Sequence, residues 1–201
     1  MLQNIKWLGH AGFKLSGEKT VYIDPFKIEE HEPADIIIIT HEHFDHLSPE
    51  DIKKIQTGKT VIVTTKDCFS KVSGNVKTIS AENSLDVDGI KIEAVPAYNI
   101  NKEFHPHHKG WIGVIVTING QRIYHAGDTD NIPEMSNLKN IDVALLPVSG
   151  TYVMTAEEAA DAANTFMPKI AIPMHYASIV GTIADAERFK SLCKCKVQIL
   201  G

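Results

Sequence analysis

The pattern of apolar and polar positions predicts a mixture of strands and helices along the whole chain. The longest β-branched run lies at residues 34–40 and contains four consecutive isoleucines. An unbroken run of this kind is typical of a strand that is buried on both faces. Residues 5–15 and 20–23 resemble a meander with a glycine-containing turn between them. Further strands are expected at residues 61–64, 76–79, 84–87, 89–96, 111–118, 121–124, 143–147, 170–173 and 196–200.

Helix signals follow several of these strands. Ser48 can cap a helix that starts at Pro49 and reaches about Ile55, because proline suits the first helical position. A capping-box pattern at residues 155–158 opens a helix that runs to about residue 165. Two further helices are expected at residues 66–71 and 182–192.

Strand-rich stretches occur in both halves of the chain, and each is followed by helices. Two mixed sheets packed on each other, with the helices outside, would bury these apolar runs. No linker, repeat or low-complexity stretch interrupts residues 1–201, and this length supports one substantial core. We therefore expect a single domain of the α/β (α+β) class.

Composition narrows the classes of function. The formal net charge of -5 argues against a general nucleic-acid binder, so no nucleic-acid partner is expected. No apolar run approaches the length of a transmembrane segment, and the N-terminus lacks a signal-peptide pattern. Three cysteines, an odd number, do not make a disulfide framework, so a reducing, cytoplasmic location is expected.

The densest group of reactive side chains is the hexapeptide H-E-H-F-D-H at residues 41–46, directly after the isoleucine run. Its imidazoles and carboxylate, without a thiolate, suit one or two transition-metal ions, with zinc (Zn) first and manganese (Mn) or iron (Fe) as alternatives. His41 and His43 project to the same side of an extended segment, whereas the adjacent Asp45 and His46 must point in different directions. This spacing fits two ions better than one.

Three later segments share one pattern, an apolar strand that ends in a candidate ligand. Asp128 follows the strand near residue 124, and His175 follows the strand at 170–173. Asn99 follows the strand at 89–96, and His105 comes shortly after it. Side chains at strand ends are held by a rigid sheet but face open space, a combination that a catalytic site needs.

The order of these motifs resembles that of the metallo-β-lactamase superfamily. H-x-H-x-D-H at 41–46 is followed by G-D-T at 127–129 and P-x-H at 173–175. The opening W-L-G-H-A-G-F at 7–13, with I-D-P at 23–25, resembles the compact branch of the superfamily. That branch includes the ascorbate-6-phosphate lactonase and the N-acylphosphatidylethanolamine phospholipase D.

The resemblance runs from about Trp7 to Tyr176, nearly the whole chain. It implies a four-layer αββα sandwich, metallo-β-lactamase-like, with the metals at one edge. It also implies six metal ligands: His41 and His43 on the first metal, Asp45, His46 and His175 on the second, and Asp128 as the bridge between them.

One position departs from the family pattern. The third histidine of the first metal usually stands where this chain has Asn99. His105, His107 or His108 in the following loop could supply the imidazole, and we favour His105. Alternatively, the first site is incomplete and only one metal is tightly held. Asn99 itself remains a candidate for a supporting or substrate-binding role.

Three other residues are candidates around the metals. Asp24, at a strand end, could orient a ligand histidine by accepting its other N–H, or it could be a simple turn residue. His10 could reach the site from an apolar strand, or it could be a satisfied core histidine. Lys102 opens a cationic loop, residues 102–109, that could contact a phosphate or carboxylate of the substrate or be merely solvated.

The resemblance predicts a metal-dependent hydrolase that uses a metal-bound hydroxide on a small ester, lactone or phosphodiester. Zinc lowers the pKa of bound water from about 15.7 to about 7 and so supplies a nucleophile at neutral pH. Asp45 would hold this nucleophile, and Asp128 is the second catalytic candidate. The expected partner is a small-molecule substrate. Compact members of the branch often assemble, so a homo-oligomer is a further expectation.

Two alternatives stay open at this point. A di-iron oxidoreductase on the same scaffold would place a carboxylate where His43 stands, so this residue counts against it. A non-catalytic metal-binding or regulatory protein is favoured only by the departure at Asn99. The presence of Asp45 and Asp128 favours a catalytic metal site over a structural one, because a structural zinc needs a closed shell of ligands without water.

Overall fold

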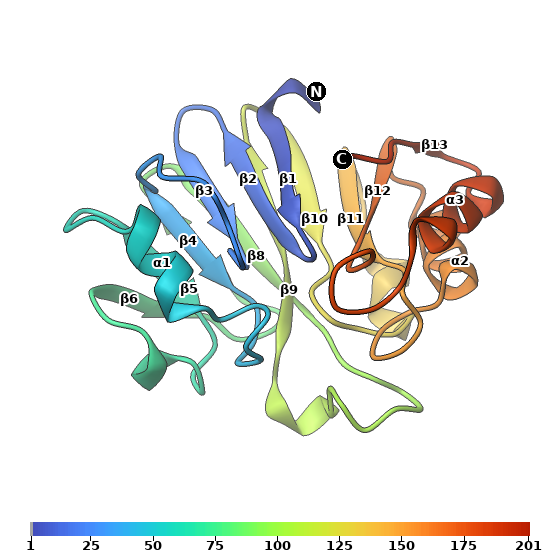
Figure 1. Cartoon of the computed structure of the whole chain (residues 1–201), viewed down its shortest axis with the longest axis horizontal. Helices are drawn as coiled ribbons and strands as arrows, with labels where there is room; N and C mark the ends of the chain where they lie inside the picture. Colours follow the sequence, from blue (N-terminus) through green and yellow to red (C-terminus); the bar gives the residue numbers. More distant parts are fainter. Residues whose placement is uncertain (1) are drawn as a thin grey trace.

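Two β-sheets lie face to face in the computed structural model, which describes residues 2–201 (Figure 1). The strands of the six-stranded sheet, in spatial order, are β1 (Ile5–Gly9), β2 (Gly12–Ser16), β3 (Thr20–Ile23), β4 (Ile36–Ile39), β5 (Val61–Thr64) and β6 (Asn75–Thr78). Those of the seven-stranded sheet are β13 (Lys196–Val197), β12 (Ile170–Met174), β11 (Val143–Pro147), β10 (Gln121–His125), β9 (Ile112–Ile118), β8 (Ile90–Pro96) and β7 (Ser84–Val87).

The α-helices lie on the outer faces of the two sheets. Helix α1 (Pro49–Ile55) covers the first sheet, while α2 (Ala156–Phe166) and α3 (Ile183–Leu192) contact β11 and β12 of the second (Figure 1). The four layers confirm the predicted αββα sandwich. Short 3₁₀ turns occupy Leu2–Asn4, Phe69–Lys71, His107–Lys109 and Pro133–Asn137.

The isoleucine run is β4, and its burial on both faces follows from the two layers beside it. Ile36 and Ile38 belong to the core between the sheets, whereas Ile37 and Ile39 pack under α1. All four side chains are fully buried. Burying each of these side chains contributes about 1.5–3 kcal/mol to the stability of the fold. The strand that precedes the hexapeptide is therefore firmly held.

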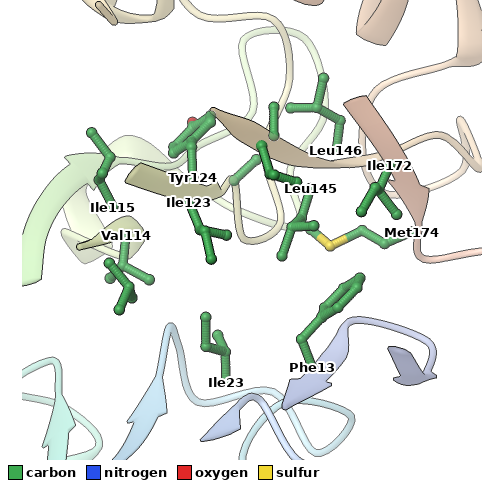
Figure 2. Close-up of a cluster of buried hydrophobic side chains, with 14 of the residues drawn as sticks. Phe13, Ile23, Val114, Ile115, Ile123, Tyr124, Leu145, Leu146, Ile172 and Met174 are labelled. Carbon is green, nitrogen blue, oxygen red and sulfur yellow. The ribbon is translucent and has the colours of Figure 1, made fainter. Parts of the chain in front are cut away.

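The core between the sheets joins residues that are far apart in the sequence. Phe13 and Ile23 of the first sheet face Ile123, Leu145 and Met174 of the second (Figure 2). Because both sheets contribute to one continuous core, their strand ends are held at a constant spacing.

Parallel pairing brings the carboxyl ends of several strands to the same edge of the sandwich. Strands β3 and β4 are parallel in the first sheet, and β10, β11 and β12 are parallel in the second. Asp24, His41, Asp128 and His175 directly follow β3, β4, β10 and β12 or lie within three residues of them. The topology therefore gathers the candidate ligands at one place.

Three predicted elements differ from the structure. The expected strand at residues 5–15 is a hairpin of β1 and β2, because Gly9 and His10 adopt positive φ of 100° and 51° and turn the chain. Of the helix expected at 66–71, only the 3₁₀ turn Phe69–Lys71 forms, and of the strand at 196–200 only Lys196–Val197 pairs. Among residues 2–201, no helix is long and apolar enough to span a membrane.

Candidate metal centre

The edge where these strand ends meet carries three overlapping groups of possible metal ligands. Within each group, the ligand atoms lie within 4.8 Å of one another. The groups are His41, His43 and His105; His10, Asp45, His46 and His175; and His41, His46 and Asp128. All seven metal ligands expected from the sequence are therefore brought together, with His10 beside them.

The hexapeptide forms a tight turn between β4 and α1. The amides of His46 and Leu47 donate to the carbonyl of His43 at 3.0 and 2.8 Å. Ser48 then caps α1 by accepting from the amide of Asp51. Because β4 and α1 fix both ends of this turn, its side chains project from a rigid frame.

The first group surrounds one point from two segments of chain. His43 Nδ1 lies 3.2 Å from His105 Nε2, and the ring of His41 lies 4.7 Å from that of His43 and 5.2 Å from that of His105. His105 is thus the loop histidine that reaches the site. His107 and His108 lie in the 3₁₀ turn outside all three groups.

Asp128 lies between the two sets of histidines. Its Oδ1 is 3.2 Å from His46 Nε2, and its Oδ2 is 3.1 Å from His175 Nε2 and 3.2 Å from His105 Nε2. The preceding Gly127 has φ +66°, and a Cβ there would lie 2.7 Å from the carbonyl oxygen of Ile112. Glycine therefore allows the sharp turn that directs Asp128 into the cluster.

Four buried nitrogen and oxygen atoms at the centre of the cluster lack hydrogen-bond partners and are suited to binding a metal. His41 Nε2, His46 Nε2, His175 Nε2 and Asp128 Oδ1 have no hydrogen-bond partner among residues 2–201. Buried polar atoms are nearly always partnered, so four unpartnered ones in one cluster call for a cation that accepts their lone pairs. Imidazole nitrogens and carboxylate oxygens, without sulfur, suit zinc and related ions.

The Nδ1 atoms of three of the histidines meet oxygen atoms. His46 Nδ1 donates to Asp24 Oδ2 at 2.7 Å, and His175 Nδ1 lies 3.1 Å from Ser149 Oγ. His41 Nδ1 lies 3.0 Å from Thr40 Oγ1. Asp24 accepts from His46 Nδ1, and the Thr40 hydroxyl, which gives its own proton to Asp24, accepts from His41 Nδ1. The Nε2 lone pairs of His41 and His46 are therefore directed to the cluster, where they can bind a metal.

Asp24 is the central supporting residue. It is fully buried and accepts from the Thr40 amide at 2.8 Å, the Thr40 hydroxyl at 2.6 Å and His46 Nδ1. It therefore orients His46 directly and reaches His41 through Thr40. Of the two interpretations of Asp24, the geometry favours the orienting role over the simple turn.

Asn99 supports His105 from behind. Its Oδ1 accepts from the His105 amide at 2.9 Å and lies 3.1 Å from His105 Nδ1. Its Nδ2 donates to Asp130 Oδ1 at 3.0 Å, and Lys102 donates to the same oxygen at 2.6 Å. These bonds tie the loop into a closed unit, so Lys102 is directed to Asp130 and away from the cluster.

His10 reaches the cluster from the turn between β1 and β2, not from a strand. Its Nε2 lies 2.9 Å from Asp45 Oδ2, and its ring lies 4.0 Å from that of His175. The carbonyl of His10 also accepts from the amide of His175, which links the two sheets at the site. Asp24, His10 and His175 all have positive φ, and strained backbone of this kind clusters at functional sites.

The electrostatic environment favours carboxylates in their ionised form. Burial raises the pKa of Asp45, but the hydrogen bond with His10 and the nearby His46 outweigh it and bring the pKa to about 2. Burial likewise opposes ionisation of Asp128, yet His175 and His46 hold its pKa well below the usual value. Both carboxylates are therefore charged at neutral pH.

The histidines divide by their surroundings. Burial lowers the pKa of His41 well below its usual value, and burial also lowers that of His43, so both rings are neutral and have lone pairs to donate. Burial alone would lower the pKa of His46, but Asp128 and Asp24 outweigh it and raise this pKa well above its usual value. The carboxylates of Asp24 and Asp128 therefore favour a positive charge at His46, supplied by a proton or by a metal.

A cavity of about 360 Å³ opens onto the cluster, a size typical of sites for small molecules. It is lined by His43, Phe44, Asp45, Phe104, His105, Asp128, Tyr152 and Ile179. The sequence pattern did not identify Phe104, Ile179 or Ser149 as parts of the site. They stand on loops without a motif, and only the folded chain brings those loops together.

Comparison with known proteins gives relatives along almost the whole chain. The profile of the Beta-lactamase superfamily domain matches residues 4–175. A UPF0173 metal-dependent hydrolase of Pyrococcus abyssi is 35% identical over 216 residues, covering 98% of this chain and 95% of that protein. One from Methanoculleus marisnigri is 35% identical, covering 92% and 86%.

A solved structure agrees with the sequence relatives. The crystal structure of a protein from Parabacteroides distasonis, named as a candidate metal-dependent hydrolase, superimposes with a TM-score of 0.88. It is 36% identical and the match covers 97% of this chain and 91% of that one. These findings confirm the predicted fold and the hydrolase class. The chain therefore belongs to the metallo-β-lactamase superfamily, as one of its metal-dependent hydrolases.

Proposed function

We propose that this hydrolase binds two zinc ions and cleaves a small ester, lactone or phosphodiester. The first ion would be held by His41, His43 and His105, the second by Asp45, His46 and His175, with Asp128 between them. The observation that carries the proposal is the set of four unpartnered buried atoms, which face one another without hydrogen-bond geometry. Two ions would give each of these atoms a partner.

The protein's own residues supply positioning and charge. Bound zinc would activate water and polarise the carbonyl or phosphoryl group of the substrate. Asp45 is ionised and its Oδ2 is held by His10, so it can accept a hydrogen bond from the attacking water and orient it. Asn99 and Asp24 keep His105 and His46 in their ligating orientations. The cavity beside this machinery accommodates a small molecule.

Metal analysis combined with two substitutions tests the proposal. We expect close to two zinc ions per chain, and hydrolysis of at least one member of a panel of esters, lactones and phosphodiesters. His46→Ala and Asp128→Ala should lose metal and activity together, while His31→Ala, an exposed histidine away from the cluster, should lose neither. Unchanged activity in either of the first two variants would refute the assignment.

The identity and number of the metals separate the remaining alternatives. One ion per chain would mean that the His41, His43 and His105 group is too weak to hold zinc. Iron in place of zinc would favour the oxidoreductase, and no metal would favour a regulatory protein. Manganese in place of zinc would be consistent with the hydrolase function, since it activates bound water in a similar way.

We also propose that residues 1–201 act as one hydrolase domain in the cytoplasm on a small-molecule substrate. The free thiols of Cys68, Cys193 and Cys195 support a reducing compartment. A homo-oligomer is a further proposal, which analytical ultracentrifugation of the purified chain tests.

A further inference from the structure

We propose that the part of the substrate outside the cleaved bond is an uncharged, apolar group, such as an alkyl chain or an aromatic ring. This inference rests on the proposed hydrolase function and specifies its substrate class. Its basis is an apolar rim, formed by Phe44, Phe104, Tyr152 and Ile179, around the mouth of the metal centre.

The apolar rim comes from four separate loops that meet at the cavity. Phe44 belongs to the turn after β4, Phe104 to the β8–β9 loop, Tyr152 to the loop after β11 and Ile179 to the loop after β12. Phe44, Phe104 and Ile179 are 68, 50 and 39% exposed.

Aromatic contacts hold the side chains of the rim in place. The rings of Phe104 and Tyr152 meet edge to face with centroids 4.7 Å apart, and Phe44 meets Phe26 in the same way at 5.8 Å. Single exposed apolar side chains need no explanation, but several that converge on a reactive cavity mark a binding surface. A ligand that covers them gains about 25 cal/mol for each Å² of apolar surface removed from water.

The charged residues around the cavity also support an uncharged substrate group. No lysine or arginine lines it among residues 2–201, and its charged groups are Asp45 and Asp128 at the metal cluster. Two cations of the β8–β9 loop are engaged elsewhere, because Lys102 binds Asp130 at 2.6 Å and Lys109 binds Glu42 at 2.8 Å. A carboxylate or phosphate on the distal part of a substrate would lose water against the rim without gaining a partner.

Two esters that share a leaving group test this preference. 4-Nitrophenyl butanoate ends in a methyl group where 4-nitrophenyl succinate carries a carboxylate, and the two acyl chains are otherwise alike. Because the succinate carboxylate also attacks its own ester, the rate of spontaneous hydrolysis is measured for each ester and subtracted. We expect kcat/KM for the butanoate to be higher by about tenfold or more, because the unpaired carboxylate is disfavoured at the rim. Equal values, or a preference for the succinate, would overturn the inference while leaving the hydrolase function intact.

Variants of the rim assign the effect to its residues. Phe104→Ala should lower kcat/KM for the butanoate by about tenfold, the scale of a small apolar contact, and lower it less for the succinate, so that the preference between the two esters shrinks. Ile100→Ala is the matched control, since Ile100 stands on the same loop, is 60% exposed and does not line the cavity. Ile179→Lys should move the preference toward the succinate. Equal losses on both esters in Phe104→Ala would contradict a specificity role.

Binding of indole gives a readout without turnover. Chemical-shift changes on addition of indole should centre on Phe44, Phe104 and Ile179 and should disappear in Phe104→Ala but persist in Ile100→Ala. If neither ester is cleaved but indole binds in this way, the proposed cleavage of esters is wrong, whereas the proposed apolar binding site is supported. If indole does not bind at the rim, the inference fails whatever the activity. A dimer that dissociates in Phe104→Ala would assign the rim to self-association and overturn it as well.

Discussion

The substitution Asp24→Asn tests how the orientation of His46 affects metal binding, because it leaves His46 itself in place. The Asp24 carboxylate is fully buried and accepts three hydrogen bonds, from the Thr40 amide, the Thr40 hydroxyl and His46 Nδ1. Asparagine has the same size and tolerates the φ of 44° at this position. The substitution therefore changes one acceptor into a donor with little disturbance of packing.

The consequence for His46 follows from the hydrogen-bond geometry. If the new amide nitrogen faces His46 Nδ1, it donates to that atom, and the proton of the ring must move to Nε2, the atom available to the metal. If the amide flips, its nitrogen faces the amide N–H of Thr40, and two buried donors oppose each other. Either outcome weakens the metal site, by about 10- to 100-fold in affinity. This corresponds to about 1.4–2.8 kcal/mol.

The assay is a zinc titration of the metal-free protein in competition with a chromophoric chelator. Circular dichroism and the Tm of the metal-free variant check that the fold is retained. Asp51→Asn is the matched control, because Asp51 is a buried carboxylate that accepts from the amides of Lys27 and Ile28 away from the metal ligands. We expect it to keep wild-type zinc affinity.

Two results would refute this reasoning. Wild-type zinc affinity in a folded Asp24→Asn protein would mean that the Asp24 contact does not control the orientation of His46. An equal loss of affinity in Asp51→Asn would show that removing any buried carboxylate weakens the site through stability alone.

Three further predictions concern the loop ligand, the turn before Asp128 and acid stability. His105→Ala should lower the zinc content toward one per chain while His107→Ala retains two, and equal contents by elemental analysis would exclude His105 as a ligand. Gly127→Ala should lower the free energy of unfolding in urea by about 1–3 kcal/mol, because its φ is positive and its Cβ would overlap a carbonyl; no loss would contradict this. Burial raises the pKa of Asp51, but hydrogen bonds led by Lys54 and Ser48 outweigh it and lower this pKa. Asp51→Asn should therefore destabilise the protein at pH 7, and the deficit should shrink as the pH falls below about 4, where the wild type loses this contribution. A deficit equal at pH 3 and pH 7 in urea titrations would be the contrary result.

The hexapeptide and the strand pattern were predictable because their signals are local. Alternation and β-branched runs identify strands from neighbouring residues, so β4, β8 and β9 appear close to their expected bounds. The H-x-H-x-D-H spacing lies within one turn of chain, and Asp128 and His175 stand within three residues of strand ends. Where the local signal was misleading, at Gly9 and His10, positive φ in two successive residues replaced an apparent strand with a hairpin.

The loop histidine that we propose as the third ligand of the first metal shows the limit of local signals. The sequence offered three histidines after Asn99, and nothing in their spacing distinguishes them decisively. In the fold, Asn99 accepts from the backbone of His105, while Lys102 and Asp130 fasten the loop. The loop closes by contacts between segments about 30 residues apart, such as Lys102 with Asp130, and a linear pattern does not reveal such contacts.

The sequence by itself determined the class of this protein: a sandwich of two mixed sheets, an edge carrying imidazole and carboxylate, and a hydrolytic metal chemistry. The mixture of strands and helices follows from periodicity, and the imidazole and carboxylate ligands follow from residues that are close together in the chain. The sandwich architecture and the hydrolytic chemistry follow from the resemblance of these motifs to the metallo-β-lactamase superfamily. Only the tertiary structure decided which loop histidine joins the cluster, which carboxylate orients His46, and which side chains form the apolar rim. The physical reason is that these features depend on loops from four or more strand ends meeting in space, and their relative positions are set by the core between the sheets.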